Sequence, residues 1–135
     1  MAIVTVCGSW ENRELIHTIC EKLEKKGYIT LVPTFYNIKK YSESMDSEGE
    51  MLLWKGAVFA NFNRIKTADV CIMINPAGYL EIESSLELGY AVSLGKLIIA
   101  LQHDHEQLRE VLFDIVLDCE DTDEIANKIS TLLKK

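Results

Sequence analysis

The 135-residue sequence lacks several features that define common protein classes. It has no apolar run long enough to span a bilayer and no secretory leader, so we expect a cytoplasmic protein with no membrane partner. Its 14 Lys and Arg residues are outnumbered by 21 Asp and Glu residues, and the net charge of −7 argues against binding to a nucleic acid polymer. The length and the ordinary apolar content predict a single domain over residues 1–135.

Motifs of several catalytic and metal sites are also missing. Four cysteines are spread along the chain without a CxxC pair, and we expect reduced core residues at these positions: Cys7, Cys20, Cys71 and Cys119. His103 and His105 flank Asp104, but a loop before a helix explains this trio better than a metal site, and we expect neither metal nor cofactor. No GxSxG elbow supports a serine hydrolase, and no GxGxxG motif supports a dinucleotide fold.

Strand and helix patterns alternate along the chain. Apolar and β-branched runs predict strands at residues 2–7, 28–32, 70–74, 97–101 and 115–117. Helical spacing of apolar residues predicts helices at about 11–26, 54–65, 80–94, 103–113 and 122–133. The polar stretch 34–50 has no clean period and predicts a long loop. The sequence therefore predicts an α/β fold with a doubly wound parallel sheet of four to five strands, a flavodoxin-like or Rossmann-like three-layer sandwich.

The most informative segment runs from Asn75 to Ala91, directly after the strand at 70–74. Ligands of open α/β sheets bind at the carboxyl ends of the strands, so this segment lies where chemistry is expected. Glu83 and Glu87 are four residues apart and share one helix face, whereas Glu81 is expected to face solvent. A carboxylate on such a mostly buried helix could act as a nucleophile at a sugar carbon or as a general acid/base. A solvated acidic helix face is the alternative.

A second candidate site is the turn Gly8-Ser9-Trp10, which follows the strand at 2–7. A Gly-Ser turn into a helix exposes backbone N–H groups and a hydroxyl that suit phosphate or sugar oxygens. Alternatively, Ser9 only caps the helix. Tyr79 and Tyr90 offer rings that could stack on a base or pack within the fold.

Three segments in a fixed order carry a resemblance to a known family. They are Val6 to Ser9, Ile65 to Val70, and Gly78 to Lys96, of which the last contains Glu-x-Gly-x-Ala-x-x-x-Gly-Lys from Glu87. Together they resemble the nucleoside 2-deoxyribosyltransferase-like superfamily, which includes deoxynucleoside-monophosphate N-glycosidases. The resemblance covers about residues 2–101.

The resemblance implies roles for particular residues. Glu87 falls at the family's nucleophile, which attacks the anomeric carbon of the deoxyribose. Gly8 and Ser9 fall in the turn that holds the sugar or its 5′-phosphate, and Gly78 and Ser84 lie in the stretch that approaches the ligand. We also expect four residues near them to bind substrate: Cys7, Trp10, Tyr79 and Glu83. Asn61 stands where active relatives usually carry an aspartate that helps to protonate the leaving base, and an amide cannot exchange a proton at neutral pH.

The predicted function is cleavage or transfer at the N-glycosidic bond of a deoxynucleoside or deoxynucleotide. One alternative is a nucleotide-sensing domain without turnover, which Asn61 favours. Another is a TIR-like NAD-cleaving protein, also built around a helical glutamate on a flavodoxin-like sheet. The family's sites are often completed by a neighbouring subunit, so the resemblance implies a homo-oligomer, and Trp54, Phe59 and Phe62 offer aromatic surface for both core and interface.

Overall fold

The computed structural model describes residues 2–33 and 43–134, and its centre is a five-stranded, fully parallel sheet. The strands are β1 (Ile3–Cys7), β2 (Ile29–Leu31), β3 (Val70–Met73), β4 (Leu97–Ala100) and β5 (Ile115–Val116). Their spatial order is β2-β1-β3-β4-β5, with β5 at an edge. This is the flavodoxin-like order, so the predicted fold class is confirmed.

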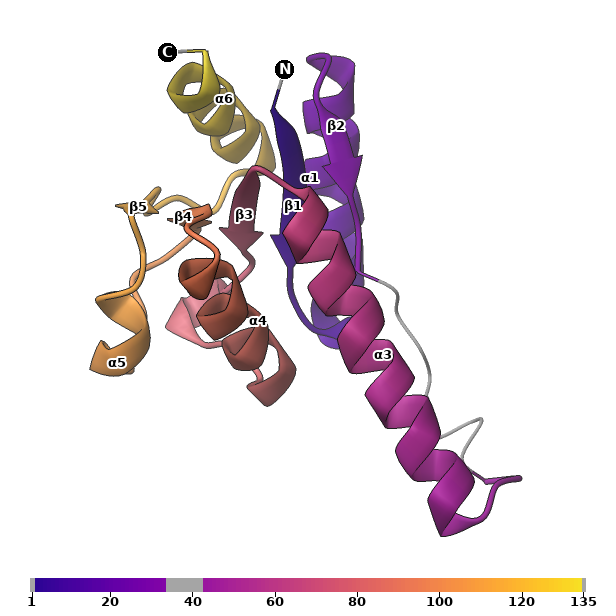
Figure 1. Cartoon of the computed structure of the whole chain (residues 1–135). Helices are drawn as coiled ribbons and strands as arrows, with labels where there is room; N and C mark the ends of the chain where they lie inside the picture. Colours follow the sequence, from indigo (N-terminus) through magenta and orange to yellow (C-terminus); the bar gives the residue numbers. More distant parts are fainter. Residues whose placement is uncertain (1, 34–42, 135) are drawn as a thin grey trace.

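Four helices cover the two faces of the sheet (Figure 1). On one face α1 (Arg13–Lys25) packs against α6 (Thr122–Leu133), and on the other α3 (Ser47–Thr67) packs against α4 (Ile82–Ser93). The apolar core is accordingly divided into two clusters, one on each side of the sheet. All four cysteines are buried and have free thiols, as the sequence predicted. No helix in the described ranges combines the length and apolar character that a bilayer crossing requires.

Helix α3 begins earlier than the sequence predicted. The Asp46 carboxylate accepts a hydrogen bond from the Gly49 N–H at 2.7 Å and caps a helix that starts at Ser47. The expected loop over residues 34–50 is therefore wrong at its end, because a polar first turn with a capping aspartate has no apolar period; residues 34–42 lie outside the described residues. The N-terminal half of α3 extends beyond the sheet (Figure 1).

The segment that follows β4 is mostly not a helix, which corrects the prediction for residues 103–113. Only α5 (Gln107–Glu110) is helical. Side-chain carboxylates accept hydrogen bonds from backbone N–H groups before this helix. The Asp104 N–H donates to Glu110 Oε2 at 2.7 Å, and the Glu106 N–H donates to Asp104 Oδ1 at 2.7 Å. Such local side-chain bonds replace the backbone bonds that a longer helix would need.

Candidate active site

The candidate site is organised around Arg64, near the C-terminal end of α3. Its Nη2 lies 2.5 Å from Glu87 Oε1 on α4 and 3.4 Å from Asn61 Oδ1. Its Nη1 donates to the Val6 carbonyl at 2.7 Å and to the Thr5 hydroxyl, both on β1. Arg64 therefore joins α3 and α4 to the carboxyl end of β1, at the point where the strand order reverses and ligands of such sheets bind.

Glu87 is a buried carboxyl group whose pKa is raised to about 8. Removal from water is the largest cause. Arg64 opposes this effect, because a positive charge favours the ionised carboxylate. Glu83, one turn earlier, adds a smaller raising effect, as expected for like charges on one helix face. Glu87 therefore changes its charge close to neutral pH, which is common at functional sites.

Cys7 lies beside this ion pair as a neutral thiol. Its Sγ is 3.9 Å from Arg64 Nη1. A hydrogen bond with Cys71 and burial raise the pKa of Cys7 well above its ordinary value, and Arg64 opposes this shift. The Cys7 side chain has no exposed surface, so it contributes to the environment of Glu87 and presents nothing to solvent.

Glu87 also borders a small hollow between α3 and α4. The hollow is lined by Val58, Asn61, Phe62, Glu83, Leu86 and Glu87. Its volume of about 20 Å³ has room for a water molecule and none for a sugar. The Phe62 ring stacks on Tyr90 with the centroids 4.4 Å apart, so Tyr90 packs within the fold. A nucleoside that enters this hollow would therefore displace side chains of α3 and α4.

Ser84 is a second polar group on the buried face of α4, three residues before Glu87. The side chain is almost fully buried, and Oγ has no hydrogen-bond partner among the described residues. A buried hydroxyl without a partner is destabilising, and a ligand hydroxyl or phosphate oxygen would satisfy it. Ser84 therefore remains a candidate ligand contact.

The turn after β1 is explained largely by packing. A Cβ at Gly8 would lie 2.8 Å from Ile16 Cδ1, so glycine lets α1 approach the strand end. Ser9 precedes the 3₁₀ turn η1 (Trp10–Asn12), but its hydroxyl makes no capping hydrogen bond, which contradicts the simple capping interpretation. The nearest side-chain partner is Asn12 Nδ2, 3.4 Å from Ser9 Oγ. Trp10 is exposed, with the Arg13 guanidinium 4.3 Å from its ring centroid.

Gly78 and Tyr79 follow β3 and contact the loop after β4, apart from the hollow at Glu87. Gly78 ends the 3₁₀ turn η2 (Pro76–Gly78) with φ +76°, and a Cβ there would lie 2.4 Å from the His103 carbonyl oxygen. The His105 N–H donates to the Gly78 carbonyl at 3.0 Å. The exposed Tyr79 ring lies 5.9 Å from the Arg109 guanidinium carbon.

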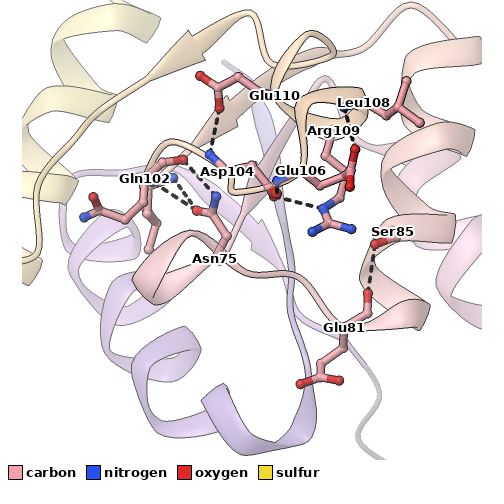
Figure 2. A network of polar contacts seen from close by, with 10 residues as sticks. Asn75, Glu81, Ser85, Gln102, Asp104, Glu106, Leu108, Arg109 and Glu110 are labelled. Carbon is pink, nitrogen blue, oxygen red and sulfur yellow. Dashed lines mark hydrogen bonds and ion pairs between the residues drawn. The ribbon is translucent and has the colours of Figure 1, made fainter.

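A polar network fixes the loop after β4 against the turn after β3 (Figure 2). The fully buried Asn75 accepts hydrogen bonds from the Leu101 and Gln102 N–H groups at 3.1 and 3.0 Å and donates to the Gln102 carbonyl at 2.8 Å. Further along, Arg109 Nε donates to Asp104 Oδ2 at 2.9 Å. Within the described ranges, no three His, Cys, Asp or Glu side chains are grouped so that they could hold a metal ion.

The two acids at the start of α4 differ in their exposure. Glu81 is partly buried, and its carbonyl accepts a hydrogen bond from Ser85 Oγ at 3.1 Å (Figure 2). Glu83 is the more exposed of the two, although it borders the hollow. Glu81 lies in the N-terminal cap position of α4, because the helix begins at Ile82, and it keeps part of its surface exposed.

Arg64 and Asn75 were not predicted from the sequence. Arg64 follows Asn61 by three residues, which places both on one helix face, and it precedes the fully buried Ile65. The spacing of three residues from Asn61 could therefore have indicated that Arg64 lies beside the candidate site. Asn75 stands between an apolar strand and Pro76, where a turn residue is ordinary, so nothing in the sequence distinguishes it.

Several solved structures have the same fold. CMP N-glycosidase BcmB from Clostridium botulinum matches with a TM-score of 0.59 and 17% identity, over 96% of this chain and 98% of that one. A 2-deoxyribosyltransferase from Bacillus psychrosaccharolyticus matches with a TM-score of 0.65 and 18% identity, over 93% and 91%. A conserved protein from Enterococcus faecalis matches with a TM-score of 0.66 and 13% identity, over 98% and 99%.

A scan of protein-family models and a search of curated proteins gave no match. The chain therefore shares its fold, over nearly its whole length, with a CMP N-glycosidase and a 2-deoxyribosyltransferase, and this agrees with the resemblance in its sequence.

Proposed function

We propose that this protein cleaves or transfers at the N-glycosidic bond of a deoxynucleoside or nucleotide, with Glu87 as the nucleophile. The observation that carries the proposal is a buried carboxyl group with a pKa of about 8, held by Arg64 near the carboxyl end of β1. Two structural relatives are a CMP N-glycosidase and a 2-deoxyribosyltransferase, and their names support the N-glycosidic bond as the target here as well.

The reaction requires two displacements at one carbon. An oxygen of ionised Glu87 forms a bond to C1′ of the sugar, the C1′–N bond breaks, and its electron pair leaves with the base, which takes a proton from water. A water molecule, or a second base, then attacks C1′ and releases the Glu87 carboxylate, losing its proton to solvent. Glu87 is therefore regenerated, and hydrolysis consumes one water molecule.

Protonation of the leaving base is the step that this chain supports least. Asn61 stands at the position of the family's acid, and its amide cannot supply a proton. Its Oδ1 instead faces Arg64 Nη2 at 3.4 Å. We therefore expect slow turnover, with the proton supplied by water, and a preference for bases that leave easily.

A panel of substrates tests the proposal. Purified protein is incubated with deoxynucleosides, deoxynucleoside and ribonucleoside 5′-monophosphates including CMP, and NAD, and the free base is quantified. Glu87→Gln should abolish base release, whereas the matched change Glu21→Gln, at an exposed glutamate on α1 outside the site, should leave most of it. Absence of base release from every compound would refute the proposal, as would unchanged release in Glu87→Gln.

A nucleotide-sensing protein without turnover is the second candidate function. Asn61 at the acid position favours it, as do the ion pair that occupies Glu87 Oε1 and the small volume of the hollow. Such a protein would gain thermal stability with one of the compounds in the panel and release no base from it.

We also infer that the protein forms a homo-oligomer through α3. Its projecting half exposes Met51 (69% exposed), Leu52 (64%) and Trp54 (48%), and Phe59 (53%) follows just beyond that half. An apolar surface of this kind is unusual for a monomer. Gly56 lies among these side chains and leaves open space, so a second helix could approach closely. Phe62 belongs to the core stack with Tyr90 and is not part of this surface.

Molecular mass in solution tests this inference. Light scattering should give a multiple of the chain mass of 15.3 kDa. Phe59→Lys should lower the measured mass, whereas Val111→Lys, at an apolar position outside α3 that is still more exposed, should not. A monomeric native protein would refute the inference.

A further inference from the structure

Arg64 is anchored to β1 independently of Glu87. Nη1 carries two hydrogen bonds to that strand, one to the Val6 carbonyl and one to the Thr5 hydroxyl. Nη2, on the same planar group, is directed at Glu87 Oε1. Because a guanidinium is rigid and flat, the bonds of Nη1 fix the direction in which Nη2 donates. The position of the Glu87 carboxylate is thus set by the end of β1, through Arg64.

Arg64 holds the Glu87 carboxylate through one of its two oxygens. Oε1 accepts the hydrogen bond from Arg64 at 2.5 Å, whereas Oε2 accepts none from the described residues. Asn61 Oδ1 lies 3.4 Å from the same Nη2 and so supports the guanidinium on the α3 side. One carboxylate oxygen is held and the other remains available.

We propose that Arg64 is a positioning residue for Glu87: anchored to the end of β1, it holds Oε1 and leaves Oε2 as the oxygen that attacks C1′. This proposal rests on the proposed function of Glu87 as a nucleophile. It also gives Asn61 a task that an amide can perform, which is to orient Arg64. A carboxylate that is already oriented reacts faster than a mobile one, because its conformational entropy is lost on folding and not during the approach to the transition state.

Charged and titratable groups face Glu87 from four elements. They are Arg64 on α3, Cys7 on β1, Cys71 on β3 and Glu83 on α4. Arg64 is the one cation among them, so its removal should raise the pKa of Glu87 further above 8. Cys71 also titrates, because a hydrogen bond from Cys7 lowers its pKa, so the experiment is repeated in a Cys71→Ala background.

The test combines a titration with kinetics. The side-chain carboxyl of Glu87 is followed by ¹³C NMR from about pH 5 to 10 in protein labelled at glutamate, and its signal is assigned by its loss in Glu87→Gln. Arg64→Met should raise the Glu87 pKa by about one unit or more. Arg64→Lys keeps the positive charge and should leave the pKa within about half a unit, which also covers the case in which Arg64→Met does not fold. Arg109→Met, at the ion pair with Asp104, is the control and should not change it.

The kinetic arm separates positioning from folding. Arg64→Lys should lower kcat for base release by about tenfold or more with little change in KM, because an ammonium group cannot bind β1 and Glu87 with one planar fork. An unchanged Glu87 pKa in Arg64→Met would overturn the proposal, as would an undiminished kcat in Arg64→Lys. If the native protein releases no base, the proposed function fails and so does the attacking role of Oε2, while the titration still decides whether Arg64 holds Glu87.

Discussion

Arg64 and Glu87 form a buried ion pair between α3 and α4, with Nη2 and Oε1 2.5 Å apart and side-chain exposures of 8% and 5%. Burial removes both groups from water, and this cost can exceed their mutual attraction. The raised pKa of Glu87 is the measurable sign that burial outweighs the effect of Arg64. The pair is therefore poorly explained by stability alone, which favours a role in function.

Stability should depend on pH through Glu87. The pKa of this carboxyl is about 8 in the folded chain and 4.5 at its ordinary value, so the folded state binds a proton that the unfolded state releases. Its contribution is fully present below about pH 4.5 and is lost as the pH rises through about 8. Urea unfolding between about pH 5 and 9 should show this decline, on the order of a few kcal/mol.

The variant Glu87→Gln separates the contribution of Glu87 to the pH dependence of stability from that of other titrating groups. His103 contributes in the same direction, because its hydrogen bond with Glu110 raises its pKa. The quantity to compare is therefore the difference between the native protein and Glu87→Gln, which should be smallest near pH 5 and should grow in favour of the variant as the pH rises to about 8. Parallel stability curves for the two proteins would contradict the raised pKa.

The coupling between Arg64 and Glu87 should grow with pH. A double-mutant cycle of Arg64→Met and Glu87→Leu measures it as the departure from additivity in the free energy of unfolding. Near pH 9, where Glu87 is ionised, we expect a coupling of roughly 2–3 kcal/mol, and near pH 6 about 1 kcal/mol or less. Equal coupling at both pH values would mean that Glu87 does not titrate within this range.

Gly78 should tolerate alanine poorly compared with Gly95. Both have positive φ, +76° and +72°, but a Cβ at Gly78 would lie 2.4 Å from the His103 carbonyl oxygen, whereas none of the surrounding atoms comes within 4 Å at Gly95. Gly95→Ala should cost about 1–2 kcal/mol of unfolding free energy for the left-handed backbone alone. Gly78→Ala should cost roughly 3 kcal/mol or more, because backbone must move as well. Thermal unfolding of the two variants decides this, and equal losses would be inconsistent with the close approach.

Base release should increase with pH if Glu87 is the nucleophile. Only the ionised carboxylate attacks, so kcat/KM for the free enzyme should rise up to about pH 8 and then level off. Initial rates on the best substrate of the panel, measured from about pH 6 to 9.5, give the profile. A rate that does not vary over this range would assign the attack to another group.

Much of the fold could be predicted from the sequence because its strands are short, apolar and separated by helices of clear period. The strand from Val70 to Met73 and its neighbours were found in this way, and the polar start of α3 was not, because Asp46 stabilises that helix end by a local hydrogen bond. Glu87 could be singled out because it interrupts the apolar face of a helix that follows a buried strand. Its role as a nucleophile stays a prediction.

The sequence by itself determined the alternation of strands and helices along the chain, and this alternation predicted a parallel sheet. It could do so because hydrophobic periodicity is a local property of the chain. Only the tertiary structure decided what surrounds Glu87. Arg64 is 23 residues away from it on another helix, and the pKa of about 8 arises from burial and from charges that separate segments bring together. Desolvation and Coulomb interactions depend on distances in space, and no local pattern in the chain encodes them.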